Sequence, residues 1–141
     1  MSIPMILAPL FVQVLLTFAV MIGMMVTRTG ALQSGTTRLE DIAMREPNWP
    51  RQAALYGNSF SNQFELPVLF YVLTILAMMT KHADLLFVLL AWVFVALRIL
   101  QALVHVTSNN VRFRGGYYGA AALVLLIMWL IFIIKIMLGL P

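Results

Sequence analysis

The chain has 141 residues, of which 62% are hydrophobic and 10% are charged, and its formal net charge is +4 at neutral pH. A water-soluble domain with so few charged residues would expose large apolar patches, so this composition indicates an integral membrane protein. The positive charge is attributed to membrane topology and anionic headgroups, because no soluble surface interleaves basic and aromatic residues as a nucleic-acid-binding protein would. The chain contains no cysteine, so thiol chemistry would need a thiol brought by a ligand.

Four apolar segments are long enough to cross a bilayer as helices. A hydrocarbon core of roughly 30 Å requires about 20 predominantly apolar residues per helix. The segments are residues 3–26, 53–79, 85–106 and 117–138, and the one long hydrophilic connection is 27–52. The first segment lacks the basic n-region and the cleavage pattern of a signal peptide. The sequence therefore predicts an all-α, four-helix integral membrane bundle that forms one domain over residues 1–141.

The positions of the cations predict the orientation of this bundle. Arginines gather in the connections after the first and third segments, whereas lysines lie in the short turn after the second segment and near the end of the chain. The connection arginines are Arg28, Arg38, Arg45, Arg51, Arg112 and Arg114, and the lysines are Lys81 and Lys135. Cytoplasmic connections are enriched in Lys and Arg, so both arginine-rich connections are predicted to be cytoplasmic and both termini to lie outside.

The second segment begins with polar side chains and continues as an uninterrupted apolar run. Asn58, Asn62 and Glu65 lie at i, i+4 and i+7, a spacing that places them on one face of a continuous helix. The sequence therefore predicts a polar face at the cytoplasmic end of this span. In the first span, Gln13 and Thr17 lie at i and i+4, and this polar pair is predicted to make a contact between helices.

The third segment repeats this pattern with Arg98, Gln101 and His105 at i, i+3 and i+7. An arginine at bilayer depth costs about 2.5 to 3.5 kcal/mol on insertion scales, so it should face the bundle interior and be paired. Glu65 lies at a matching depth on the antiparallel neighbour, which predicts a Glu65–Arg98 ion pair. Two interpretations of that pair stay open: it staples the bundle, or it belongs to a ligand site.

The polar residues of the second and third segments meet the start of the fourth at the cytoplasmic end. Arg112, Arg114, Tyr117 and Tyr118 lie there, and a polar seam flanked by arginines is typical of a site for a small anionic ligand. Taken singly, a loop arginine is more often a topology signal and an interfacial tyrosine part of the aromatic belt. His105 has no second His, Cys or carboxylate at ligand spacing, so no metal site is predicted.

Together, these motifs resemble one known family. Four spans, the N-x-x-E element of NQFE, the R-I-L-Q-x-x-x-H pattern of the third segment and the R-F-R-G-G-Y-Y sequence before the fourth resemble the MAPEG family, the membrane-associated proteins of eicosanoid and glutathione metabolism, and in particular bacterial members. The resemblance covers almost the whole chain. Members often carry a tyrosine where this chain has His105.

The resemblance implies a homotrimer that holds glutathione between neighbouring subunits near the cytoplasmic side, with one arginine lowering the pKa of the thiol. By position, Arg114 or Arg112 would serve the thiol, and the other ligand-binding residues would be Arg28, Asn62, Glu65, Arg98, Tyr118 and His105. No metal is implied. The expected location is a bacterial inner membrane, and the expected partners besides a second and third copy are membrane lipids and lipophilic small molecules.

Three functions are compatible with the sequence. The first is a glutathione-dependent transferase or peroxidase, in which a thiolate adds to a lipophilic electrophile delivered by the membrane. The second is a MAPEG-like protein that binds lipids or small molecules without glutathione chemistry, and the third is a small multidrug transporter. The transporter is the least favoured, because the first segment has no acidic residue and a paired Glu65 would be poorly suited to cycling protons.

Overall fold

The computed structural model describes residues 2–44 and 48–141, and these residues form an all-helical bundle. In chain order the elements are α1 (Ile3–Gln33), the 3-10 helix η1 (Leu39–Asp41), α2 (Arg51–Asn62), α3 (Leu66–Met79), α4 (Leu85–Val106) and α5 (Val111–Met137). Four segments are long and apolar enough to cross a membrane: α1, the α2–α3 pair, α4 and α5. The all-α, four-span membrane bundle predicted from the sequence is confirmed.

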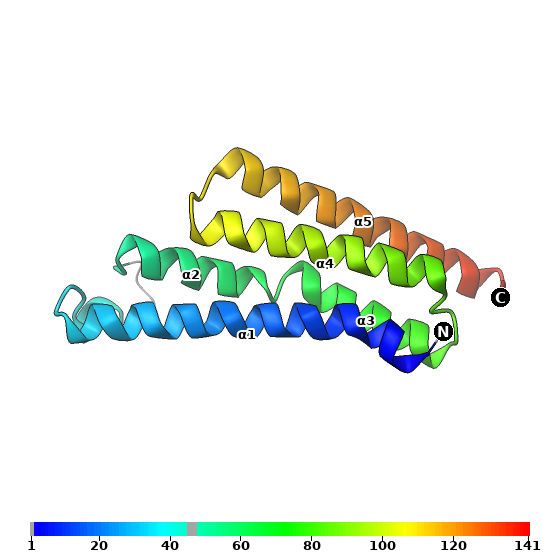
Figure 1. Ribbon diagram of the computed structural model, residues 1–141, viewed down its shortest axis with the longest axis horizontal. Coiled ribbons are helices and arrows are strands. Elements are labelled where there is room, and N and C mark those ends of the chain that lie inside the picture. Colours follow the sequence, from blue (N-terminus) through cyan, green and yellow to red (C-terminus); the bar gives the residue numbers. More distant parts are fainter. Residues whose placement is uncertain (1, 45–47) are drawn as a thin grey trace.

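The helices run roughly parallel or antiparallel to one another, as Figure 1 shows. The longest helix, α1, packs against α2, α3 and α4, and α5 packs against α4 and α3. Both termini and the α3–α4 turn lie at one end of the bundle, and the α1–α2 and α4–α5 connections lie at the other (Figure 1). The connections that carry the loop arginines are therefore at the same end.

Side-chain caps explain where two of the helices begin. The Asp84 carboxylate accepts a hydrogen bond from the Phe87 backbone N–H at 2.9 Å and starts α4. The Asn110 side chain accepts hydrogen bonds from the backbone N–H groups of Arg112 at 3.1 Å and Phe113 at 3.3 Å. Because this cap precedes the apolar run, α5 begins at Val111 rather than at residue 117 as predicted.

The second span is broken in the middle, which corrects the prediction of one helix over residues 53–79. Helix α2 ends at Asn62 and α3 begins at Leu66. Pro67 lies in the first turn of α3, and it has no backbone N–H with which to continue the helical hydrogen bonds from α2. The turn carries Glu65 to an exposed position. The prediction that Asn58, Asn62 and Glu65 share one helix face was therefore wrong, since the face ends with α2.

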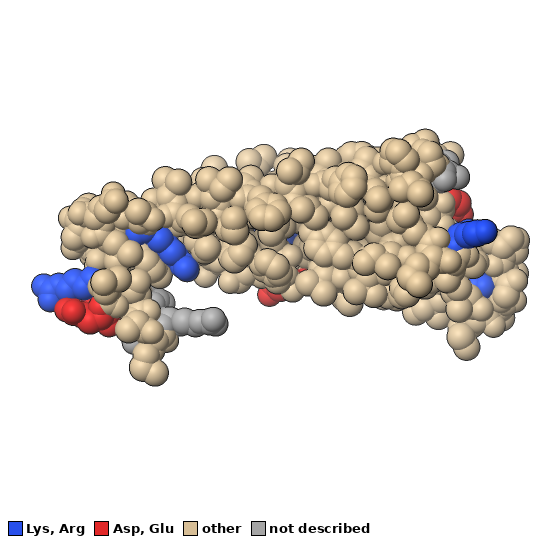
Figure 2. Space-filling model, turned by 90° about the horizontal axis from the view of Figure 1, so that it is seen from below, with Lys and Arg blue, Asp and Glu red and all other residues tan. Residues whose placement is uncertain are grey.

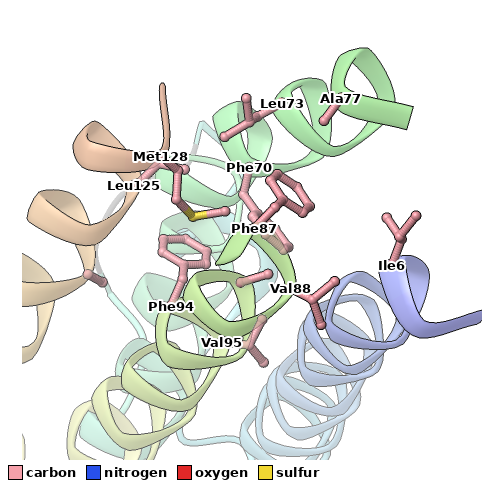
Figure 3. Close-up of a cluster of buried hydrophobic side chains, with 12 residues drawn as sticks. Ile6, Phe70, Leu73, Ala77, Phe87, Val88, Phe94, Val95, Leu125 and Met128 are labelled. Carbon is pink, nitrogen blue, oxygen red and sulfur yellow. The ribbon is translucent and has the colours of Figure 1, made fainter. Parts of the chain in front are cut away.

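The apolar core lies between α3, α4 and α5, in the half of the bundle near the α3–α4 turn. Figure 3 shows Phe70 of α3 beside Phe94 of α4, with Met128 of α5 near both. The two phenylalanine rings have centroids 4.9 Å apart, within the range favoured by aromatic pairs. This tightly packed half leaves the opposite half of the same helices for polar side chains.

The outer surface is apolar over its length and charged at its ends. Figure 2 shows blue and red side chains concentrated at the two ends of this face, with a wide tan region between them and a small charged patch near its middle. Large apolar side chains with more than half of their surface exposed include Phe11, Leu15 and Phe18 of α1 and Leu123 of α5. Such a surface is stable in a lipid environment or against another subunit.

Candidate functional site

A polar cleft lies between α2, α4 and α5, towards the arginine-rich end of the bundle. Its volume is about 360 Å³. The lining residues come from the last part of α2, the last turns of α4 and the first turns of α5, and they are Asn58, Asn62, Gln101, His105, Arg114, Gly115 and Tyr118. Of the residues predicted to bind a ligand, Asn62, His105, Arg114 and Tyr118 are brought together here.

Arg98 is the buried cation next to this cleft. Its side chain is 1% exposed, and its Nη2 donates to the Asn62 backbone oxygen at 3.2 Å and to the Asn62 side-chain oxygen. Its Nη1 donates to Gln101 Oε1, and the Gln101 Nε2 donates in turn to the same Asn62 side chain at 3.2 Å. The guanidinium carbon lies 5.9 Å from the centre of the Tyr118 ring. Arg98 thus contacts three residues that line the cleft.

The predicted ion pair between Glu65 and Arg98 is not formed. The described residues make two ion pairs, Arg38–Glu40 and Lys135–Asp84, and neither involves Glu65 or Arg98. The physical reason is the helix break. It turns the Glu65 carboxylate away from the face of α2 on which Asn62 contacts Arg98 of α4. Neutral amide groups occupy the position where the sequence predicted a carboxylate.

A second buried network ties the helix break to α1. The Gln13 side chain, with 0% exposure, donates to Gln63 Oε1 at 2.8 Å, and Gln63 donates to the Ser59 backbone oxygen at 3.1 Å. Gln13 therefore makes the predicted contact between helices, whereas the Thr17 hydroxyl donates to the Gln13 backbone oxygen on its own helix at 3.1 Å. Because Gln63 directly follows Asn62, this network holds the segment that presents Asn62 to Arg98.

Two cleft residues have contrasting surroundings. The Arg114 Nη1 donates to the Asn109 side chain at 2.6 Å, and Asn109 adopts a left-handed backbone conformation with φ of 50° in the α4–α5 turn. This contact orients the Arg114 side chain at the rim. His105 is 5% exposed, and within residues 2–44 and 48–141 neither of its ring nitrogens makes a hydrogen bond with the protein.

Three other predicted site residues do not line the cleft. Arg112 is exposed on the first turn of α5, and Glu65 is exposed at the helix break. Arg28 packs 4.9 Å from the centre of the Trp49 ring, and a Cβ added to Gly57 of α2 would lie 2.8 Å from its Nη2. For these three residues to contact a ligand as predicted, the site would have to include a neighbouring subunit or be arranged differently.

Three lining residues were missing from the predicted ligand-binding set. Asn58 and Gln101 were already signalled by the i, i+4 and i, i+3 spacing to Asn62 and Arg98. Gly115 had no such signal, because its place in the cleft depends on the early start of α5. That start is set by the Asn110 cap, which apolar composition does not reveal.

The fold and the cleft define a small multi-pass membrane protein with a polar site at one end of a helical bundle. The sequence model of the MAPEG family matches residues 6–134, nearly the whole chain. The chain belongs to the MAPEG family, and is thus a membrane protein of the glutathione and eicosanoid metabolism family. No curated protein and no solved structure gives a significant match.

Proposed function

We propose that the protein is a glutathione-dependent transferase or peroxidase that adds the glutathione thiolate to lipophilic electrophiles. The observation that carries this proposal is the pairing of a buried Arg98, whose hydrogen-bond partners within the described residues are all neutral, with Arg114 on the rim of the same cleft. A buried cation normally has an anionic partner or loses stability. An anionic ligand would supply that partner.

The side chains of the cleft suit the chemistry of glutathione. Its peptide groups need both donors and acceptors, which the amides of Asn58, Asn62 and Gln101 provide. Its carboxylates and its thiolate need cations, for which Arg114 and the adjacent Arg98 are available. The volume of about 360 Å³ falls in the range of roughly 300 to 1,000 Å³ that is usual for small-molecule sites.

The chemical step follows from the position of Arg114. A free thiol has a pKa of about 8.5, and a fixed guanidinium beside it stabilises the thiolate near neutral pH. The thiolate is the nucleophile, and it forms a carbon–sulfur bond with an electrophile that partitions into the surrounding lipid. Arg114 is favoured over Arg112 for this role because Arg114 lines the cleft, whereas Arg112 is exposed outside it.

The proposal includes a homotrimer in a bacterial inner membrane, with both termini non-cytoplasmic. Support comes from Glu65, an exposed carboxylate in the middle of the second span. A charge facing lipid at that depth is costly, and a neighbouring subunit would cover it. The arginine-rich connections support a cytoplasmic position for the end of the bundle that holds the cleft.

Calorimetric titration of glutathione into the detergent-solubilised protein tests this function, together with turnover of chlorodinitrobenzene. Replacing Arg114 by Ala should raise the pKa of the bound thiol and lower kcat by at least about tenfold, because a charge-assisted contact contributes about 1.5 to 3 kcal/mol. The Arg38→Ala variant is the matched control, since Arg38 is exposed at the same end and pairs with Glu40 at 3.6 Å. A parent that neither binds millimolar glutathione nor turns over refutes the proposal.

One observation favours the alternative of a binding protein without glutathione chemistry. Arg114 is the one cationic side chain among the described residues that line the cleft, whereas glutathione carries two carboxylates. If the titration shows no glutathione binding but lipophilic ligands bind to the trimer, this alternative replaces the enzyme. The transporter gains support from Glu65, which forms no salt bridge among the described residues, but none of the described lining residues is acidic, so these residues offer a cationic drug no anionic partner.

A further inference from the structure

The proposed reaction leaves one proton without an acceptor, and this inference rests on that reaction. Forming a thiolate from bound glutathione requires a group that takes the thiol proton. Among the described residues that line the cleft, a guanidinium has no lone pair to accept a proton, and carboxamides, a phenol and a glycine are poor bases. His105 is the remaining side chain, and imidazole is the side chain best suited to exchange protons near neutral pH.

The surroundings of His105 leave its ring free for such a role. It lies in the last turn of α4 and is 5% exposed, yet it lines the cleft. Within the ranges that the structure describes, no protein group hydrogen-bonds to either ring nitrogen. Neither ring nitrogen is among the buried polar atoms that lack a partner, so both are open to the cleft, where water or a ligand can hydrogen-bond to them.

The charged groups near His105 decide which ligand atom suits it. On its own helix the nearby charge is Arg98, and on α5 it is Arg114, with the neutral phenol of Tyr118 beside them. From α2 it faces the amides of Asn58 and Asn62. Both neighbouring charges are positive and disfavour an imidazolium, so the proton that His105 accepts must be balanced by an anion that forms next to it. A thiolate produced by the proton transfer is such an anion.

We propose that His105 is the general base of the reaction. The sulfur–hydrogen bond of glutathione breaks, the proton moves to a ring nitrogen of His105, and the electron pair stays on sulfur. The thiolate then forms a bond to the electrophilic carbon, and the leaving group departs with its own electron pair. The imidazolium returns the proton to water, so the step consumes no oxidant or reductant. Arg114 stabilises the sulfur anion, and His105 accepts the proton.

The test compares His105→Gln with the parent, because glutamine retains hydrogen bonding but does not accept a proton at neutral pH. The matched control is His82→Gln at the other end of the bundle, where His82 Nε2 lies 2.9 Å from the Leu140 carbonyl oxygen. Glutathione affinity of His105→Gln should stay within about threefold of the parent, whereas kcat should fall by about 10² to 10⁴, the usual contribution of general base catalysis. The thiolate absorbance of bound glutathione, measured without electrophile, should appear at a higher pH than in the parent and in His82→Gln.

Rescue distinguishes a lost base from a damaged fold. Added imidazole should restore turnover to His105→Ala, and should not change the parent or His82→Gln. If His105→Gln keeps the kcat, the pH profile and the thiolate absorbance of the parent, His105 is not the base although the proposed function stands. A loss of glutathione affinity in His105→Gln and His105→Ala without imidazole rescue also refutes the role. A parent without glutathione binding refutes the proposed function itself.

Discussion

At the scale of single residues, Arg98 shows how neutral groups can hydrogen-bond a buried guanidinium, since its hydrogen-bond partners among the described residues are all uncharged. Its guanidinium is held by the backbone and side-chain oxygens of Asn62 and by the Gln101 side chain, with the Tyr118 ring nearby. Each contact is dipolar, and each involves a residue that also lines the cleft. The same interactions that stabilise the buried cation therefore shape the site, which couples stability and ligand binding.

The first prediction concerns the coupling between Asn62 and Arg98. Asn62→Leu should lower the free energy of unfolding by about 1 to 3 kcal/mol, because it leaves a buried guanidinium short of acceptors. Combined with Arg98→Met it should cost less than the sum of the single changes, with an interaction energy of at least about 0.5 kcal/mol. Thermal unfolding in detergent gives the stability of the parent, the two single variants and the double variant. The cycle of Glu65→Gln with Arg98→Met is the control and should show a smaller coupling; strict additivity for Asn62 and Arg98 contradicts the network.

The sequence predicted the site better than it predicted the contacts within it. Spacing on single helices grouped Asn58 with Asn62 and Gln101 with Arg98, since i, i+3 and i+4 neighbours stay together wherever the helix packs. The shared end of the bundle predicted that these residues meet the start of the fourth segment. The Glu65 prediction failed because it extended one helix through Pro67. The partner of Arg98 depends on how the chain turns at that break, which is a tertiary property.

At the scale of elements, close contact between α1 and α2 positions the helix that supplies Asn58 and Asn62 to the cleft. The ring of Tyr56 on α2 occupies the space that a Cβ at Gly23 of α1 would need. By contrast, no atom lies within 4 Å of a Cβ built at Gly30 on the same helix. The helix spans were predictable from apolar length, but which glycine permits close approach was not.

These two glycines give a matched pair of variants for the second prediction. Gly23→Ala should destabilise the protein by about 1 to 3 kcal/mol, because the added methyl forces the Tyr56 ring to move. Gly30→Ala should be neutral or stabilising by up to about 1 kcal/mol, because alanine is the better helix former. Thermal unfolding of both variants in the same detergent provides the measurement. Equal stability of the two variants would show that α1 and α2 do not meet at Gly23.

The opposite end of the bundle holds a second contact between elements, which joins the start of α4 to the end of α5. Lys135 Nζ lies 2.7 Å from Asp84 Oδ2. Partial burial raises the pKa of the Asp84 carboxyl, but hydrogen bonds from Lys135 and from the Phe87 backbone N–H outweigh it, so the pKa lies below its ordinary value of 3.8. The folded state therefore favours the ionised carboxylate more strongly than the unfolded state does.

The third prediction follows from the sign of that shift. A lowered pKa in the folded state adds stability that is complete above the ordinary value of 3.8 and is lost as the pH falls through the lowered pKa. Asp84→Asn should remove this part of the acid dependence and reduce stability at neutral pH. Because both side chains are partly exposed, the effect should be at most about 1 kcal/mol. Melting temperatures of parent and variant from neutral to acid pH that stay parallel would contradict it.

For the whole molecule, the division into a packed apolar half and a polar half links the fold to the proposed chemistry. The core around Phe70 and Phe94 holds α3, α4 and α5 together near the α3–α4 turn. At the other end, the Asn62 and Gln63 networks and the Asn110 cap leave a cleft between α2, α4 and α5. A water-soluble anion from the solution at that end and an apolar molecule from the bilayer would both reach a cleft in this position.

The most direct test of the central claim is an experimental structure of the detergent-solubilised protein determined with millimolar glutathione. The account predicts ligand density in the cleft, with the sulfur within about 4 Å of the Arg114 guanidinium, a usual distance for a paired charge, and with a ligand carboxylate near the Arg98 cluster. Arg114→Ala under the same conditions should lose the order of the sulfur before that of the peptide. Glutathione bound elsewhere, or a cleft that stays empty of ligand while the protein turns over an electrophile, would contradict the account.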